Sequence, residues 1–276
     1  MSTYENNLIP IKKLYTSISK WVDEETCNTC FKTICDEYDS NCKKDLKKNH
    51  WENSQVRKLL QVHERLLLTD TMNEDIKNDF SRRYMYPRVI TYLRLTCFDQ
   101  LGQPANWITF NNWLISKKKR AEREKIVNEI QIDNKIKFTE KLYEKYLEIY
   151  GVKNSFFNFI SNVISVQTRE ELLMHIEIRT SNETSPTLAE REVTERDKAE
   201  YLFKIRNDFT HNTYSQGPVK GLPKKNESEW DFRETFYKGK ERFSISTHKN
   251  FEEKLKEIVL IGIAEIIKKK SNAECT

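Results

Sequence analysis

Apolar residues recur every three or four positions along most of the chain, which is the period of an amphipathic helix. This pattern predicts helices over residues 8–21, 53–69, 73–101 and 249–270, and a cysteine-bearing helical stretch that ends near residue 48. A long charged helix is expected to begin near Thr109 and to run to Tyr150, where Gly151 would stop it. The chain should therefore be mainly α-helical and form a multi-helix bundle.

The second half of the chain combines further helices with one strand pattern. Thr168 and Glu171 have the spacing of a capping box and predict a helix that runs to about residue 179. Residues 180–190 are rich in Ser, Thr and Pro and predict a linker. Thr187 and Glu190, at the end of this segment, repeat the capping-box spacing and predict a second helix from Thr187 to about residue 212. Alternating apolar and polar residues on both sides of Gly239 predict a small β-hairpin near 229–247.

Composition supports this fold class and narrows the function. Only 6 Gly and 6 Pro occur in 276 residues, which disfavours turn-rich β architectures. No apolar run approaches the roughly 20 residues that span a bilayer, and the first residues lack the apolar region of a signal peptide. We therefore expect a cytoplasmic protein without membrane contact.

Positive charge is concentrated in one short stretch. The net charge of +5 is too small to indicate a nucleic-acid partner by itself, but "SKKKRAEREK" at 116–125 is strongly basic. Lys117, Lys118, Lys119 and Arg120 could form a basic surface that binds RNA. The alternative is an ordinary solvated helix face with ion pairs between successive turns.

The cysteines favour reduced thiols over a disulfide framework, since the 6 Cys are clustered or scattered in a chain that should be cytoplasmic. Cys27, Cys30, Cys35 and Cys42, followed by His50, could in principle ligate zinc. Their spacing is not that of a zinc knuckle or ribbon, so we expect neither a metal nor another cofactor.

One polar stretch, "KIRNDFTHN" at 204–212, places Arg206, Asn207 and His211 at the end of a predicted helix. The spacing Arg-x4–6-His also occurs at Arg57, Arg169 and Arg242, whereas composition predicts roughly one match by chance. Arg206 is distinguished because Asn follows it, and the full R-N-x3-H form is expected only about a few hundredths of a time by chance.

This stretch resembles the signature of the HEPN superfamily, whose helical domains include many RNA endonucleases. The resemblance covers about 150–270, where apolar helices precede and follow the motif. It implies a HEPN-like domain at 151–276 after a helical region at 1–150 of unknown role, and a nuclease of prokaryotic defence or toxin type. Some HEPN toxins carry a modified Tyr two residues after the His, whereas Tyr214 here is three residues after it.

Helical geometry constrains how this motif can work. Asn207 and His211 share one face of an ideal helix, whereas Arg206 and His211 are about 140° apart. Either the helix bends near Thr210, or two copies of the chain contribute to one cleft. HEPN nucleases use the second arrangement, so the resemblance implies a homodimer with a composite active site.

The residue types suit RNA cleavage without a metal, in which the ribose 2′-hydroxyl attacks the adjacent phosphate. His211 would transfer protons near neutral pH, Arg206 would stabilise charge on the phosphate, and Asn207 would orient the imidazole. Lys204 adds a cation for the RNA. The alternative is a catalytically inactive helical module that binds RNA, a nucleotide or a protein such as an antitoxin or sensor.

Overall fold

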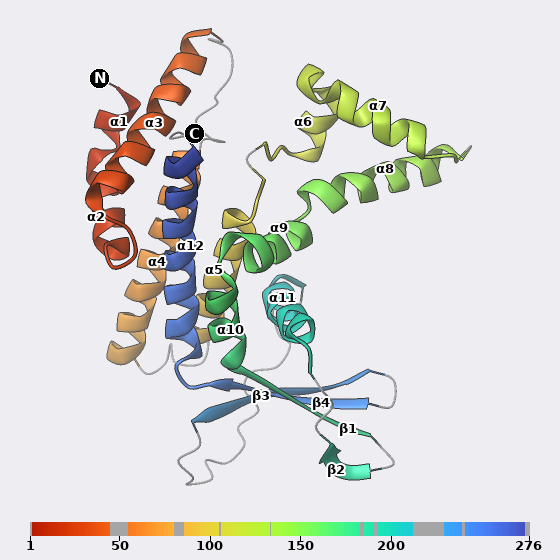
Figure 1. Ribbon diagram of the computed structural model, residues 1–276. Helices are drawn as coiled ribbons and strands as arrows, with labels where there is room; N and C mark the ends of the chain where they lie inside the picture. Colours follow the sequence, from red (N-terminus) through yellow and green to blue (C-terminus); the bar gives the residue numbers. More distant parts are fainter. Residues whose placement is uncertain are drawn as a thin grey trace.

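The computed structural model describes residues 2–44, 55–79, 86–104, 106–132, 134–182, 185–189, 193–211, 229–238 and 241–273 (Figure 1). The fold is mainly α-helical, as the apolar periodicity predicts, and a small antiparallel sheet lies at one end. No helix in these ranges is sufficiently long and apolar to cross a bilayer.

A bundle of helices forms the larger part of the molecule. Its members are α1 (Thr3–Asn6), α2 (Leu8–Ile18), α3 (Glu24–Lys44), α4 (Gln55–Asn78), α5 (Tyr86–Leu101) and α12 (Phe251–Ala273). The predicted helix over 249–270 is confirmed as α12, whose buried residues include Leu255, Ile258 and Val259. The boundary between α4 and α5 differs from the prediction, because α4 continues to Asn78 and α5 begins at Tyr86.

A helical arm follows α5 and projects from the bundle (Figure 1). It contains α6 (Phe110–Ile115), a 3-10 turn (Lys117–Lys119), α7 (Arg120–Glu129) and α8 (Lys135–Tyr150). The predicted start near Thr109 and stop at Gly151 are confirmed, since Thr109 caps α6 and Gly151 follows α8, but the helix between them is not continuous. Ile130 is extended, and the Asn134 side chain caps a new helix by accepting hydrogen bonds from two backbone N–H groups of its first turn.

Three elements precede and support the motif helix. They are α9 (Val152–Asn158), a π-helical turn (Phe159–Val163) and α10 (Val166–Met174). The motif helix itself is α11 (Glu195–His211). The caps of α10 and α11 lie at other residues than the predicted Thr168 and Thr187. The Ser165 hydroxyl caps α10, and Thr194 exchanges hydrogen bonds with Asp197 at the start of α11.

The sheet consists of β1 (Ile176–Asn182), β2 (Ser185–Ala189), β3 (Trp230–Lys238) and β4 (Glu241–His248), in the antiparallel order β2-β1-β4-β3. Strands β3 and β4 confirm the predicted hairpin. The prediction for 176–189 is wrong, because this segment contributes β1 and β2 and not a helix end, a linker and the start of another helix at Thr187. Residues of β1 instead pair with β4 from Ile176↔Thr247 to Asn182↔Glu241.

Two apolar clusters hold the described parts of the chain together. The main core joins residues from α2 to α5 with residues from α9 to α12, so it contains residues from both sides of the boundary predicted at residue 150. The second cluster belongs to the arm and centres on Trp113, Ile126, Tyr146 and Tyr150.

Candidate functional site

Helix α11 carries the R-N-x3-H motif in its last turns. Leu202 is buried on the side that faces the core, and Phe203 packs edge-on against Phe156 of α9, with ring centroids 5.3 Å apart. Nearer the end of the helix, Phe209 stacks on Tyr92 of α5 at 4.4 Å. These aromatic contacts fix α11 against α5 and α9, and they determine where the motif side chains lie.

Arg206 is held by a carboxylate from α5. Its Nε and Nη2 atoms both lie 2.8 Å from Oδ2 of Asp99, and its Nη1 donates a hydrogen bond of 3.1 Å to the Asn207 side-chain oxygen. The Arg206 side chain is 16% exposed and the Asp99 side chain is 11% exposed. The guanidinium is therefore fixed in orientation along two edges, and its charge is partly compensated.

Asp99 orients the Arg206 guanidinium, and no local pattern in the sequence points to this residue. Burial raises the pKa of its carboxyl to about 6, and this effect outweighs the Arg206 guanidinium, which acts in the opposite direction. Arg65 of α4 also lowers this pKa and donates a hydrogen bond to Thr96 on α5. The carboxylate is thus ionised at neutral pH but loses its charge in mildly acidic solution.

The structure describes the side chain of Asn207 but not that of His211. Asn207 uses its side-chain oxygen to accept from Arg206. His211 is the last residue of α11, but its side chain lies outside the described part of the structure, as does Tyr214. The expected contact between Asn207 and the imidazole therefore stays a prediction.

The predicted RNA-binding residues do not gather around Arg206. Lys204 is on the same helix and forms an ion pair of 3.2 Å with Asp208. Lys117, Lys118, Lys119 and Arg120 lie on the arm, in a different region of the molecule from α11 (Figure 1).

The basic stretch on the arm is partly neutralised. Lys119 bonds to Glu122 at 2.9 Å and also to the Tyr150 hydroxyl, and Arg120 pairs with Glu124 at 2.8 Å. Lys117 and Lys118 are exposed. This arrangement matches a solvated surface with local ion pairs, and it leaves two lysines to contact a partner.

Three cysteines of α3 face the core. Cys27, Cys30 and Cys35 are buried free thiols, and burial raises the pKa of Cys27 to about 12 and that of Cys35 to about 11. Within the described residues, no group of three or more His, Cys, Asp or Glu side chains could hold a metal ion. The side chain of Cys42 and all of His50 lie outside those residues. The three described thiols therefore act as small apolar core residues.

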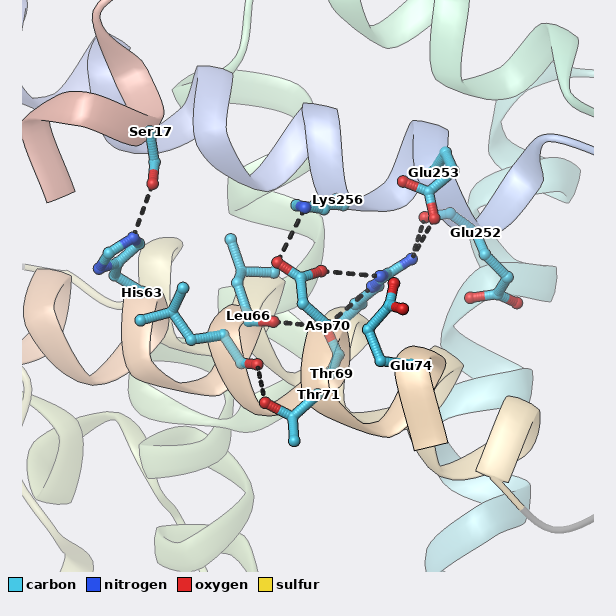
Figure 2. A network of polar contacts seen from close by, with 12 residues as sticks. Ser17, His63, Leu66, Thr69, Asp70, Thr71, Glu74, Glu252, Glu253 and Lys256 are labelled. Atoms are coloured by element: carbon cyan, nitrogen blue, oxygen red, sulfur yellow. Dashed lines mark hydrogen bonds and ion pairs between the residues drawn. The ribbon is translucent and has the colours of Figure 1, made fainter. Parts of the chain in front are cut away.

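A second polar cluster lies between α4, α5 and α12. Arg94 is fully buried, and it donates to the Thr69 hydroxyl at 3.2 Å and to the Glu252 backbone carbonyl at 2.6 Å. Figure 2 shows Asp70 reaching Lys256, 2.9 Å away, beside these groups. Arg94 also forms an ion pair of 3.6 Å with Asp70. The cluster joins three helices of the bundle, so we interpret it as a structural junction.

Comparison with known proteins adds no family assignment. No protein-family model matches the chain, and neither a curated protein nor a solved structure matches it.

Proposed function

We propose that this protein is a metal-independent endoribonuclease of HEPN type, in which Arg206 and His211 are the catalytic residues. The observation that carries the proposal is the fixed guanidinium of Arg206. It is oriented by Asp99 and lies next to Asn207, on the helix that ends at His211. A preorganised arginine loses little entropy when it binds a phosphate, which favours stabilisation of a transition state.

The proposed reaction uses the RNA itself as the nucleophile. His211 removes a proton from the ribose 2′-hydroxyl or supplies one to the leaving 5′-oxygen, since imidazole titrates near neutral pH. Arg206 stabilises the negative charge that builds on the attacked phosphate. The products are a 2′,3′-cyclic phosphate end and a 5′-hydroxyl end, and DNA is not cleaved because it lacks the nucleophile.

The proposal includes a homodimer with a composite site, acting in prokaryotic defence or as a toxin, with an antitoxin or sensor as a possible partner. Arg206 and His211 point about 140° apart on one straight helix, and a second copy can supply the missing partner for each. Light scattering of the purified protein should give twice the mass of the chain.

The decisive experiment compares RNA cleavage by the wild type, Arg206→Ala and His211→Ala in EDTA. We expect the wild type to cleave structured RNA, and each variant to lose at least about a hundredfold in rate. A matched control is the Arg242→Ala, His248→Ala double variant, which removes a pair with similar spacing from strand β4 and should cleave normally. Analysis of the product ends tests the cyclic phosphate.

A second candidate function is a catalytically inactive module that binds RNA, a nucleotide or a protein. The observation that favours it is the same ion pair, because Arg206 and Asp99 join α11 to α5 and would do so without any catalysis. Absence of cleavage by the wild type would favour this candidate, and cleavage that persists in both variants would contradict the assigned residues.

A further inference from the structure

A groove of about 530 Å³ lies beside the N-terminal half of α11, against α9, the π-helical turn and α10. Its floor is apolar and includes Phe157, Ile160, Leu173 and Ala199. Its rim is charged and carries Lys153, Arg169 and Arg196 together with Glu195 and Glu200. An apolar floor below a charged rim suits a ligand that has one flat apolar part and one ionic part.

The rim presents more positive than negative charge to such a ligand. Arg169 meets Glu195 through its Nε atom at 3.0 Å, and Arg196 meets Glu200 through its Nε atom at 3.2 Å. The Arg196 side chain is 84% exposed, so its guanidinium can reach another acceptor beside Glu200. Lys153 is exposed and forms no ion pair with the described residues. The rim can therefore bind a phosphate, which arginine contacts through two nitrogens at once.

Aromatic side chains connect the groove with the motif. Phe157 lines the groove and contacts Phe203 of α11, with ring centroids 5.8 Å apart, and both rings are half-buried. Phe203 lies one helical turn before Asn207. Ala199 in the groove and Arg206 are seven residues apart, which places them on nearly the same side of the helix and about 10 Å apart along its axis.

We infer that this groove binds one nucleotide of a single-stranded RNA substrate, with the base on Phe157 and the phosphate on Lys153 and Arg196. The inference rests on the proposed function and identifies where its substrate is held. Aromatic side chains in a positively charged groove bind single strands, because every base has a face that can stack. A duplex cannot use the groove, since its bases are already stacked and paired.

The test measures binding of a fluorescein-labelled single-stranded RNA of 12 nucleotides to the full chain in a His211→Ala background, where cleavage is removed. Lys153→Ala with Arg196→Ala should bind about tenfold more weakly. The slope of log affinity against log salt should be less steep by about 0.7, because one phosphate contact of a single strand is lost. Phe157→Leu keeps an apolar side chain but loses the ring, so it should bind about tenfold more weakly with an unchanged salt dependence.

The control is Lys141→Ala with Lys145→Ala, which removes two partly exposed cations of α8 that pair with Glu144 and Glu148, and it should leave the affinity unchanged. Equal affinity of the wild type and the groove variants would overturn the inference. It would also be overturned if the Lys153 and Arg196 variant lost the same affinity for a 12-base-pair duplex. A third contrary result is groove-dependent binding of free AMP without an effect on RNA, which would assign the groove to a free nucleotide.

Failure of the nuclease proposal has a different signature. A wild type that does not cleave, yet binds single-stranded RNA through the groove, would remove the proposed activity and support the binding site. Cleavage by the groove variants with unchanged KM and kcat would support the nuclease and remove the site.

Discussion

At the residue scale, the central finding is the pairing of Arg206 with Asp99, which lies 107 positions earlier in the chain. The R-N-x3-H form indicated that Arg206 is unusual, and the structure shows that its side chain is oriented by a buried carboxylate. Asp99 itself carries no sequence signal, because it lies in the last turn of an ordinary amphipathic helix. Only the packing of α5 against α11 makes it a partner, and such long-range contacts are not encoded in local spacing.

The raised pKa of Asp99 predicts how stability depends on pH. The folded protein holds the Asp99 proton more tightly than the unfolded chain, whose aspartates titrate near pH 4. The stabilisation from this proton is therefore complete below about pH 4 and is lost as the pH rises through about 6. Relative to Asp99→Asn, whose amide does not titrate, the wild type should lose about 2–3 kcal/mol of unfolding free energy between pH 4 and pH 7.

Urea denaturation of both proteins at pH 4, 5, 6 and 7 measures this difference. Loss of the Arg206 ion pair changes the stability of Asp99→Asn by the same amount at every pH, because the amide does not titrate, so it does not alter the direction of the trend. If the unfolding free energy of the wild type rose with pH relative to that of Asp99→Asn, the attraction of Arg206 for the carboxylate would outweigh the cost of burying it.

At the scale of elements, the apolar period predicted most helices, and alternation predicted the β3–β4 hairpin. The prediction fails where the pattern of a short segment fits both a helix and a strand. "IEIRTSN" alternates apolar and polar residues, but a capping-box spacing at Thr168 and Glu171 favoured one continuous helix. The segment forms a strand because it pairs with β4. Its partner lies about 65 positions away in the chain, so the local pattern cannot reveal this pairing.

Contact between α5 and α9 depends on the absence of a side chain at Gly102. A Cβ atom at this position would lie 1.9 Å from the backbone oxygen of Ser155 and 2.7 Å from the backbone nitrogen of Phe159. Backbone atoms cannot move aside as a side chain can, so Gly102→Ala should destabilise the protein by about 3 kcal/mol. The midpoint and slope of urea denaturation measure this loss.

Asn158→Ala provides the matched control for Gly102→Ala. It removes the hydrogen bond of 2.7 Å from the Asn158 side chain to the Gly102 carbonyl, without any steric overlap. This change should cost about 1 kcal/mol. If both variants lost the same stability, the hydrogen bond and not the close approach would hold the two helices together.

At the scale of the whole molecule, the chain was expected to divide near residue 150, and the described residues form two apolar clusters, a main core and one in the arm. Helices on both sides of that position share the main core, whereas the arm from α6 to α8 has a small aromatic cluster of its own. The sequence does not reveal this division, since the arm and the bundle have the same helical period.

The separate cluster predicts that the arm can unfold by itself. Trp113 is fully buried in it and donates a hydrogen bond of 2.8 Å to Glu122. Trp113→Ala should remove about 3–5 kcal/mol from this cluster, which has only three other buried apolar side chains among the described residues, and this loss is enough to open it locally. Native-state hydrogen exchange should then show lost protection in α6 to α8 and unchanged protection in α5 and α12.

Phe31→Ala, which makes a similar cavity in the main core, provides the comparison. It should lower the protection of α12, because α3 and α12 share that core. Equal loss of protection in the arm and in α12 after Trp113→Ala would show that the two clusters unfold as one cooperative unit. Separate loss would mean that the arm, with Lys117 and Lys118 at its surface, can change conformation while the helices that hold Arg206 stay folded.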